Sequence, residues 1–256
     1  MTTTSSNGRP AGGDAHILAV ASGKGGVGKT WFAVTLSHAL ARAGHKTLLF
    51  DGDLGLANVD IQLGLMPKRD LSSALDGHGT LKTCITRHSE AGFDIIAGRS
   101  GSGSLASLPA PRVERLQKDL LALAADYDRV VLDLGAGVDR TVRQLATHTG
   151  QVLLVVNEEP TSLTDAYAFI KLLWTRHPEV EIRIVVNAAE TEEKGRKTYE
   201  TLAKACANFL KREPALAGIV RRDARVREAI RNQMPLLSRS PSSEAGADVE
   251  RIAGTL

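Results

Sequence analysis

A glycine-rich stretch near the N-terminus constrains the fold more than any other feature of this chain: Gly23-Lys24-Gly25-Gly26-Val27-Gly28-Lys29-Thr30. It follows the apolar run 16–22 and precedes a segment, 31–36, that begins a run of helically spaced apolar residues. Strand, loop and helix are the context of a phosphate-binding loop, because glycines let backbone N–H groups face a polyphosphate and the helix N-terminus attracts the same anion. The alternative is a turn that merely joins a strand to a helix.

Two residues of this stretch have predicted roles at a nucleotide. The stretch matches the pattern G-x-x-x-x-G-K-[ST], in which the lysine, here Lys29, reaches the terminal phosphates and the hydroxyl, here Thr30, ligates Mg²⁺. The apolar strand 128–133 ends in Asp133, and an aspartate at that place holds Mg²⁺ through a water. The sequence therefore predicts an ATP and Mg²⁺ site.

A second predicted strand, 46–50, ends in two further carboxylates, Asp51 and Asp53. The carboxyl ends of strands in open α/β sheets are where ligands bind. We expect Asp53 to lie near Mg²⁺ and the attacking water, with a polar cap of the next turn as the alternative. Asp51 is expected to be such a cap.

Lys24 is a second cation within the loop, five positions before Lys29, and a solvated loop charge is its simplest interpretation. The spacing K-G-G-x-G-K-T instead resembles the deviant Walker A motif of the ParA/MinD (SIMIBI) ATPases. That resemblance implies that Lys24 crosses to the nucleotide of the other subunit in a face-to-face homodimer. A cation delivered only on dimerisation would make hydrolysis depend on assembly.

Two further segments resemble the flagellar-number regulators of the FlhG/FleN branch. One is D-x-D-x-G-L-x-N-x-D at 51–60, and the other is E-P-T-S-L-T-D-A-Y at 159–167. The resemblance implies that Asn58 contributes to the active site and dimer, and that Glu159 contacts the partner's nucleotide. It also places Gly137 beside the γ-phosphate and Asn187 at the adenine edge. Thr161 or Ser162 is equally well read as the N-cap of the helix that follows.

Composition limits the other possibilities. The chain has 256 residues, 43% of them hydrophobic and 24% charged, enough for one soluble α/β domain. The net charge of +3 is too small to name a partner. The two cysteines, Cys84 and Cys206, form no metal-binding or disulfide pattern and are expected to be inert. No apolar run approaches the ~18 residues of a membrane span.

These patterns predict one doubly wound, mostly parallel sheet with helices on both faces over residues 15–256, after a disordered tail of residues 1–14. Further strands are expected at 92–98, 151–156, 180–186 and 217–220, and helices at 30–43, 71–75, 109–123 and 192–212. The family's I-P-x-D, which lines the base pocket, reads Val220-Arg221-Arg222-Asp223 here, so the proline is missing.

The predicted protein is a cytoplasmic ATPase that switches between monomer and ATP-bound dimer. The resemblance implies control of flagellar number, placement or gene expression, with flagellar switch proteins, the flagellar GTPase or a flagellar transcription activator as partners. The basic amphipathic C-terminal helix that serves membrane binding in these proteins is not evident, so at most transient association with the inner membrane is expected. The alternative is a ParA-type partitioning protein that binds DNA through the arginines of 221–231.

Overall fold

The computed structural model describes residues 14–53, 55–98, 109–147 and 149–256. The predicted tail lies outside the described residues apart from Asp14, with which β1 begins.

One sheet of eight strands organises the described part of the chain, in the order β3-β4-β2-β5-β1-β6-β7-β8. All neighbouring strands are parallel except β3 and β4, which form an antiparallel pair. This arrangement confirms the predicted single, mostly parallel, doubly wound sheet. The strands are β1 Asp14–Ser22, β2 Thr47–Gly52, β3 Ile85–His88, β4 Phe93–Ile96, β5 Arg129–Ala136, β6 Thr149–Val156, β7 Glu181–Ala189 and β8 Ala215–Arg221.

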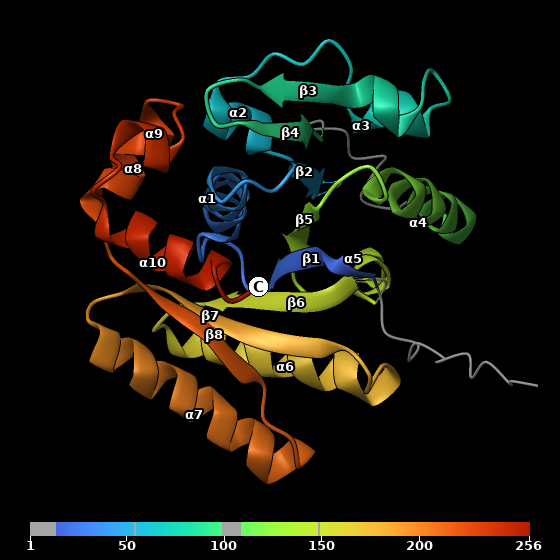
Figure 1. Ribbon diagram of the computed structural model, residues 1–256. Helices are drawn as coiled ribbons and strands as arrows, with labels where there is room; N and C mark the ends of the chain where they lie inside the picture. The colour runs from blue at the N-terminus through green and yellow to red at the C-terminus, as the bar shows by residue number, and fades with distance from the viewer. Residues whose placement is uncertain (1–13, 54, 99–108, 148) are drawn as a thin grey trace, which may run out of the picture.

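Helices cover both faces of the sheet, and Figure 1 shows α4 and α5 on the opposite side from α1 and α10. The helices that bracket the sheet are α1 Lys29–Arg42, α4 Ala110–Ala124, α5 Arg140–Ala146, α6 Pro160–Arg176, α7 Glu192–Leu210 and α10 Glu244–Ala253. The short helices are α2 Val59–Leu63, α3 Leu71–Leu75, α8 Ala224–Arg231 and α9 Leu236–Arg239, with one 3₁₀ turn at Leu81–Cys84.

The central strand β1 shows why the sheet is buried on both faces. Ile17, Ala19 and Ala21 belong to the core under α4, α5 and α6, whereas Leu18 and Val20 belong to the core under α1 and α10. A strand buried on both faces reads as a continuous apolar run, which is the pattern of this segment. β1 lies between β5 and β6, so the loop that follows it begins at the middle of the sheet.

Several short elements were not predicted. Among them are β3, a four-residue edge strand, and α5, a seven-residue helix after β5. The first residues of α6 also differ from the prediction. The N-cap is Glu159, followed by Pro160, so neither Thr161 nor Ser162 caps the helix. Ser162 instead accepts a hydrogen bond from the backbone N–H of Asn157 at 3.2 Å.

The apolar stripe of the last helix packs on the domain. The buried side of α10 includes Ala245, Val249 and Ile252, and the helix contacts α1 and β8. Cys84 and Cys206 are free, buried thiols.

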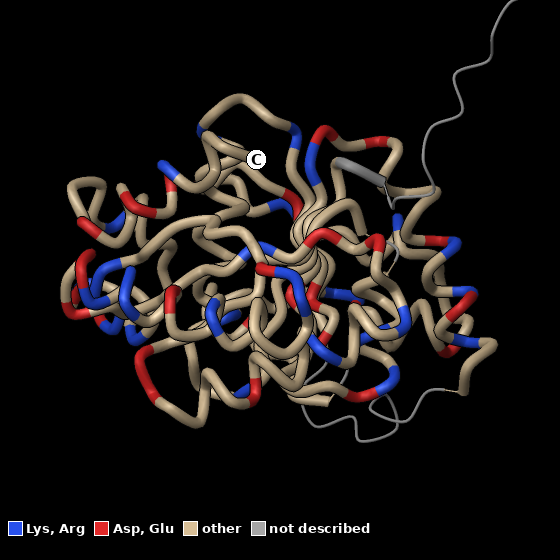
Figure 2. The backbone as a smooth tube through the Cα atoms, turned by 90° about the horizontal axis from the view of Figure 1, so that it is seen from below, with Lys and Arg blue, Asp and Glu red and all other residues tan. Residues whose placement is uncertain are grey.

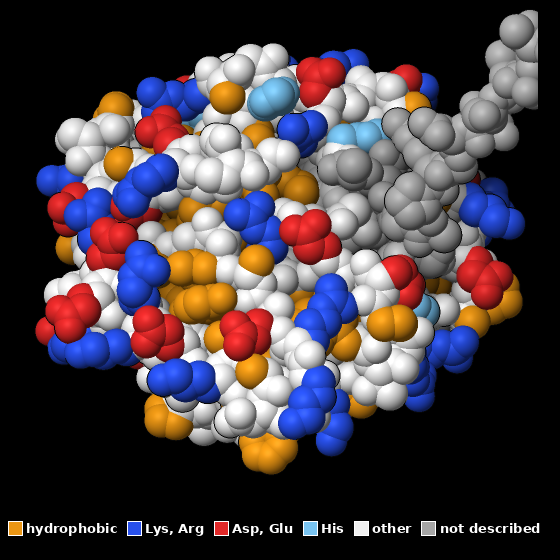
Figure 3. Space-filling view, turned by 60° about the horizontal axis from the view of Figure 1, so that its bottom comes forward, with side chains coloured by type: hydrophobic (Ala, Val, Ile, Leu, Met, Phe, Trp, Pro, Cys, Tyr) orange, Lys and Arg blue, Asp and Glu red, His pale blue; other side chains and the backbone are white. Residues whose placement is uncertain are grey.

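Lys and Arg residues are interspersed with Asp and Glu along the chain (Figure 2). The face in Figure 3 likewise shows small apolar groups between acidic and basic side chains. Among the described residues, no helix is both long and apolar enough to cross a lipid bilayer.

Candidate functional site

The glycine-rich loop 23–28 joins β1 to α1 at the carboxyl end of the central strand. Gly26 and Gly28 have φ values of +80° and +89°, which side-chain-bearing residues rarely adopt. A Cβ on Gly25 would meet nothing within 4 Å, so its backbone faces open space. With the first N–H groups of α1, which have no partner inside the helix, this loop is a cradle for an anion.

Two neighbouring elements hold the loop from behind. A Cβ on Gly23 would lie 2.4 Å from the backbone carbon of Asp165, so the loop packs directly on α6. Asn187, at the end of β7, donates from Nδ2 to the carbonyl oxygen of Val27 at 2.8 Å. A Cβ on Gly28 would come within 2.3 Å of that same nitrogen. Asn187 therefore supports the loop, and its amide nitrogen already has a protein partner. Its contact with the adenine edge stays a prediction.

Lys29 and Asp133 meet in the buried floor of the site. Lys29 Nζ lies 2.6 Å from Asp133 Oδ1, and the two side chains are 8% and 1% exposed. Burial raises the pKa of Asp133, while the charge of Lys29 and the hydroxyl of Thr30 oppose that rise. The structure thus brings together the lysine, the hydroxyl and the carboxylate that the sequence predicted.

Asp51 supports this floor from the neighbouring strand, where it pairs in register with Asp133. Its Oδ1 accepts the N–H of Asp53 at 3.2 Å, and its Oδ2 accepts those of Asn58 and Val59 at 3.1 Å each. Burial, followed by the nearby Asp133, raises the pKa of Asp51 to about 7. Asp51 is the cap of the following turn, as predicted.

Asp53 lies on the next loop, where its Oδ1 accepts the N–H of Leu56 at 3.0 Å. A Cβ on Gly135 would be 3.5 Å from that oxygen, so Asp53 is beside the end of β5. Gly137 follows with φ +96° and donates its N–H to the carbonyl of Ser22 at 2.8 Å. The ends of β1, β2 and β5 therefore meet around one point, as the parallel topology requires.

The floor of the site fits a divalent cation. Asp133 Oδ2 and Asn58 Oδ1 are buried oxygens with no hydrogen-bond partner among the described residues. Orphaned buried acceptors are costly unless something else satisfies them. Carboxylate and hydroxyl oxygens are the ligands that Mg²⁺ prefers, so Asp133, Thr30 and Asp53 form a suitable donor set.

Lys24 folds back onto its own chain. Its Nζ lies 2.5 Å from Glu159 Oε2 and donates to Thr161 Oγ1 at 2.7 Å, at the start of α6. The hydrogen bond from Lys24 to Glu159 and the positive charge of Lys24 lower the pKa of the Glu159 carboxyl. Thr161 was not predicted as a partner of Lys24, and the only sequence signal was its hydroxyl beside Glu159.

A hollow of about 430 Å³ runs from the loop to the end of β8. Gly26, Val27 and Gly28 form one end, and the other is lined by Asn187, Arg221, Arg222, Asp223, Val226, Arg227 and Ile230. It offers room for the nucleoside part of a nucleotide whose phosphates lie on the loop.

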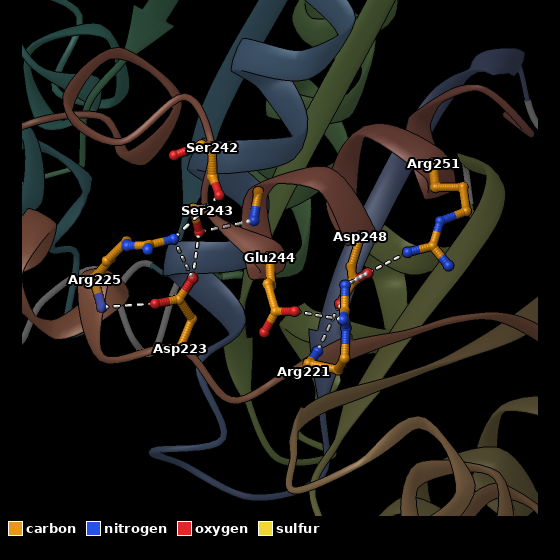
Figure 4. Close-up of polar contacts among 9 residues, drawn as sticks. Arg221, Asp223, Arg225, Ser242, Ser243, Glu244, Asp248 and Arg251 are labelled. Atoms are coloured by element: carbon orange, nitrogen blue, oxygen red, sulfur yellow. Dashed lines mark hydrogen bonds and ion pairs between the residues drawn. The ribbon is translucent and has the colours of Figure 1, made fainter.

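Arg221 stands where the family pattern has proline, and Figure 4 shows its guanidinium between Asp248 and Glu244 of α10. It donates to Asp248 through Nε and Nη2, both at 2.9 Å, and Asp248 also accepts its backbone N–H. Asp223 caps α8 through the N–H of Arg225 and accepts the hydroxyl of Ser243 at 2.7 Å. The far wall of the hollow is consequently fixed to α10.

Comparison with known proteins agrees with this geometry. The family model for CbiA, the CobQ/CobB/MinD/ParA nucleotide binding domain, matches residues 18–236. The chain is 36% identical over 238 residues to the antiactivator FleN of Pseudomonas aeruginosa, covering 93% of this chain and 85% of that protein. It is 29% identical over 245 residues to the flagellum site-determining protein YlxH of Helicobacter pylori, covering 95% and 82%.

Solved structures show the same fold. The cell division ATPase MinD of Pyrococcus furiosus superimposes with a TM-score of 0.80 at 23% identity, covering 94% of this chain and 98% of that one. The MinD of Pyrococcus horikoshii, solved with Mg-ADP, gives 0.79 at 23% identity over 94% and 96%.

Proposed function

The chain belongs to the CobQ/CobB/MinD/ParA family of nucleotide-binding proteins and is a MinD/ParA-type ATPase, and from this premise we propose that residues 15–256 form one ATPase domain that pairs on ATP binding. The observation that carries the proposal is the second loop lysine, Lys24, which is one-third exposed at the mouth of the site. Lys29 already occupies the position of the phosphate-binding lysine in the same chain. Lys24 is therefore not needed at the phosphates of its own chain and can serve the nucleotide of a second subunit.

Each residue of the site has a proposed part. The N–H groups of Gly23 to Thr30 bind the phosphates, and Lys29 donates to the terminal ones. Asp133, Thr30 and Asp53 hold Mg²⁺, which when bound neutralises charge on the β and γ phosphates. Asp53 orients the attacking water, and Gly137 offers its backbone to the γ-phosphate.

The dimer contributes the remaining groups. Lys24 leaves Glu159 and Thr161 of its own chain and stabilises the charge that develops on the partner's phosphates. Glu159 and Asn58 contribute to the face that meets the partner. Asn187, whose nitrogen binds the loop, keeps its oxygen for the amino group of adenine.

Replacing Lys24 by Ala tests this assignment. Because Lys24 acts on the partner's phosphates, we expect K24A to bind Mg·ATP within about threefold of wild type and to lose at least ~10²-fold in kcat. Lys118→Ala, an exposed lysine on α4, is the matched control. Binding is measured by calorimetry and turnover by phosphate release at several protein concentrations. Unchanged turnover in K24A would remove Lys24 from the mechanism.

The biological role follows from the relatives. We propose that the protein regulates flagellar number, placement or gene expression, because two relatives that align over most of this chain are named an antiactivator and a flagellum site-determining protein. Its proposed location is the cytoplasm, and its proposed partners are flagellar switch proteins, the flagellar GTPase or a flagellar transcription activator. Deleting the gene is expected to change the number of flagella counted by electron microscopy. Asp53→Ala, expected to retain ATP, is expected to capture a flagellar protein from motile cells, and failure of both experiments would refute the role.

A second candidate function is DNA partitioning. Arg222, Arg227 and Arg231 are exposed and form no ion pair with another described residue. If they bind the DNA backbone, affinity for random duplex would fall by roughly 10³-fold between 50 and 200 mM salt. If the ATP-bound form does not bind duplex DNA, the flagellar role would be the remaining candidate.

A further inference from the structure

The indole of Trp31 forms part of the candidate nucleotide site. Trp31 is the third residue of α1, directly after Lys29 and Thr30. Its side chain lines the hollow of about 430 Å³ together with Gly26, Val27 and Gly28. Trp31 is 5% exposed, so it is a fixed wall rather than a mobile surface group.

The indole N–H is buried without a hydrogen-bond partner among the described residues. Buried tryptophan N–H groups usually have a partner, and an unpaired one costs about 1–3 kcal/mol. The other tryptophan of the chain follows that rule: Trp174 Nε1 donates to the carbonyl of Val180 at 3.1 Å. Trp31 therefore lacks an acceptor that the folded chain does not supply.

The position of Trp31 indicates which part of a nucleotide it faces. Asp53 lines a different hollow, of about 290 Å³, with Gly135 and Leu56. The metal and terminal phosphates belong to the side of Asp53 and Asp133, whereas the Trp31 hollow leads toward Asn187 and β8. The part of a nucleotide that enters this hollow is the α-phosphate, the ribose and the base.

Three side chains with acceptor oxygens in this hollow already have partners. Asp223 accepts from Arg225 N–H and the Ser243 hydroxyl (Figure 4), Glu159 accepts from Lys24, and Asn157 Oδ1 accepts the N–H of Glu159. A ribose oxygen would supply the acceptor that the indole N–H lacks, since the nucleoside enters beside the first turn of α1.

We propose that Trp31 is a nucleotide-binding residue, whose indole packs against the nucleoside and whose N–H donates to a ribose oxygen. The inference rests on the proposed function, because it requires the phosphates of a nucleotide to lie on loop 23–30. It adds a contact made by an aromatic side chain in the first turn of α1.

Indole NMR tests the contact directly. The chain has two tryptophans, so ¹⁵N labelling gives two indole signals, and Trp174→Phe assigns them. Addition of Mg·ADP is expected to move the Trp31 N–H signal and to slow its exchange with solvent, while the Trp174 signal stays in place. Inorganic tripolyphosphate, which fills the phosphate loop without a nucleoside, is expected to leave the Trp31 N–H signal near its free position.

Binding by conservative variants provides the second measurement. Trp31→Phe keeps an aromatic ring and loses the N–H, so its Kd for Mg·ADP is expected to rise about fivefold, the loss of one neutral hydrogen bond. Its Kd for tripolyphosphate is expected to stay within twofold of wild type. Trp174→Phe, which removes a hydrogen bond far along α6, is the control and is expected to bind ADP like wild type.

The outcomes separate this inference from the function beneath it. Wild type that binds Mg·ADP while the Trp31 signal stays still, or moves equally with tripolyphosphate, would overturn the role of Trp31 and leave the ATPase assignment intact. Wild type that binds no adenine nucleotide would overturn the proposed function and this inference together. If Trp31→Phe does not fold, the NMR experiment on the unmodified chain still decides.

Discussion

Gly28 meets two requirements that no other residue type satisfies at its position. Its φ of +89° strains any residue with a side chain, and a Cβ there would meet the Asn187 amide at 2.3 Å. The first requirement is visible in the sequence, because the motif carries glycine at this position. The second is not, since Asn187 is 160 positions from Val27, the residue that it holds. The motif predicted the loop, and the structure adds what supports it.

His38 gives a pH prediction at the same scale. It is buried on α1 beside Phe93, with ring centroids 6.2 Å apart. Burial, then the charge of Arg42 and then His88, lowers the pKa of His38 from 6.5 to about 4. The folded state therefore favours the neutral ring. The contribution of His38 to the free energy of unfolding is complete above pH 6.5 and is lost as the pH falls toward 4. The loss amounts to about 3 kcal/mol.

Urea unfolding at pH 7.5 and pH 4.5 measures this loss. Carboxylates also change charge between these two pH values and affect stability. The informative quantity is therefore the difference between variants in the acid-induced loss of the free energy of unfolding. His38→Gln is expected to lose about 2 kcal/mol less than wild type over that range. His78→Gln, at an exposed position, is the control and is expected to behave like wild type. An identical acid loss in all three proteins would contradict the assignment to His38.

Lys24 shows where residue-level prediction stopped. The second lysine was recognised from its spacing, and Glu159 was named as a site residue, but their contact in one chain was not expected. The sequence offers Thr161 or Ser162 as a helix cap, and in the structure Thr161 is the second partner of Lys24. Such a contact joins residues 137 positions apart, and no local pattern encodes it.

At the scale of elements, α10 is attached to the end of β8 by a buried carboxylate. The Asp248 side chain is 1% exposed and pairs with Arg221 and Arg251. A Cβ on Gly218 would lie 2.5 Å from Ile252, so helix and strand are also in close apolar contact. Asp248→Ala would remove the acceptor of three hydrogen bonds from Arg221, which is one-third exposed and keeps Glu244, and we expect a loss of about 1–3 kcal/mol in the free energy of unfolding.

Glu244→Gln is the matched control for that variant. Glu244 pairs with the same guanidinium, but its side chain is 64% exposed, so the expected loss is below about 1 kcal/mol. Denaturant unfolding of both variants gives the comparison. Equal losses would show that burial of Asp248 does not set the strength of the attachment.

The elements that the sequence predicted and those it missed differ in length and burial. The core strands were found because they are continuous apolar runs, and α4 because its apolar positions recur on one face. β3 has only four residues, Ile-Thr-Arg-His, and lies at the edge of the sheet. Its mixed composition is common at edges, where polar side chains limit further pairing, and it gives no strand signal.

For the whole molecule, the order of the strands places all site residues at one edge. The loop after the central β1, the carboxylates near the ends of β2 and β5, and Asn187 near the end of β7 converge because parallel strands end on the same side. The fold class and this edge could be predicted from the motif and the apolar runs. The wall of the hollow at the end of β8 could not be predicted, because it depends on Arg221, which pairs with Asp248 of α10.

Ligand binding is expected to stabilise the whole domain. Mg·ADP at 100 times its Kd adds about 2.7 kcal/mol to the free energy of unfolding, which raises Tm by roughly 5–10 °C for a chain of this size. Differential scanning calorimetry measures the shift. Lys29→Ala is expected to abolish it, because that side chain is the proposed phosphate ligand. A shift of equal size in Lys29→Ala would contradict that role.

The internal pairing of Lys24 has a consequence for how readily two chains would separate. A subunit entering the proposed dimer gives up two contacts to Lys24 at the start of α6 before it gains those across the interface. The exchange is close to energetically neutral, since one charge partner replaces another. The proposed dimer would therefore depend on the bound triphosphate. Once the triphosphate is cleaved, each Lys24 can return to Glu159 and Thr161 of its own chain, so the lifetime of the dimer would be set by the rate of hydrolysis.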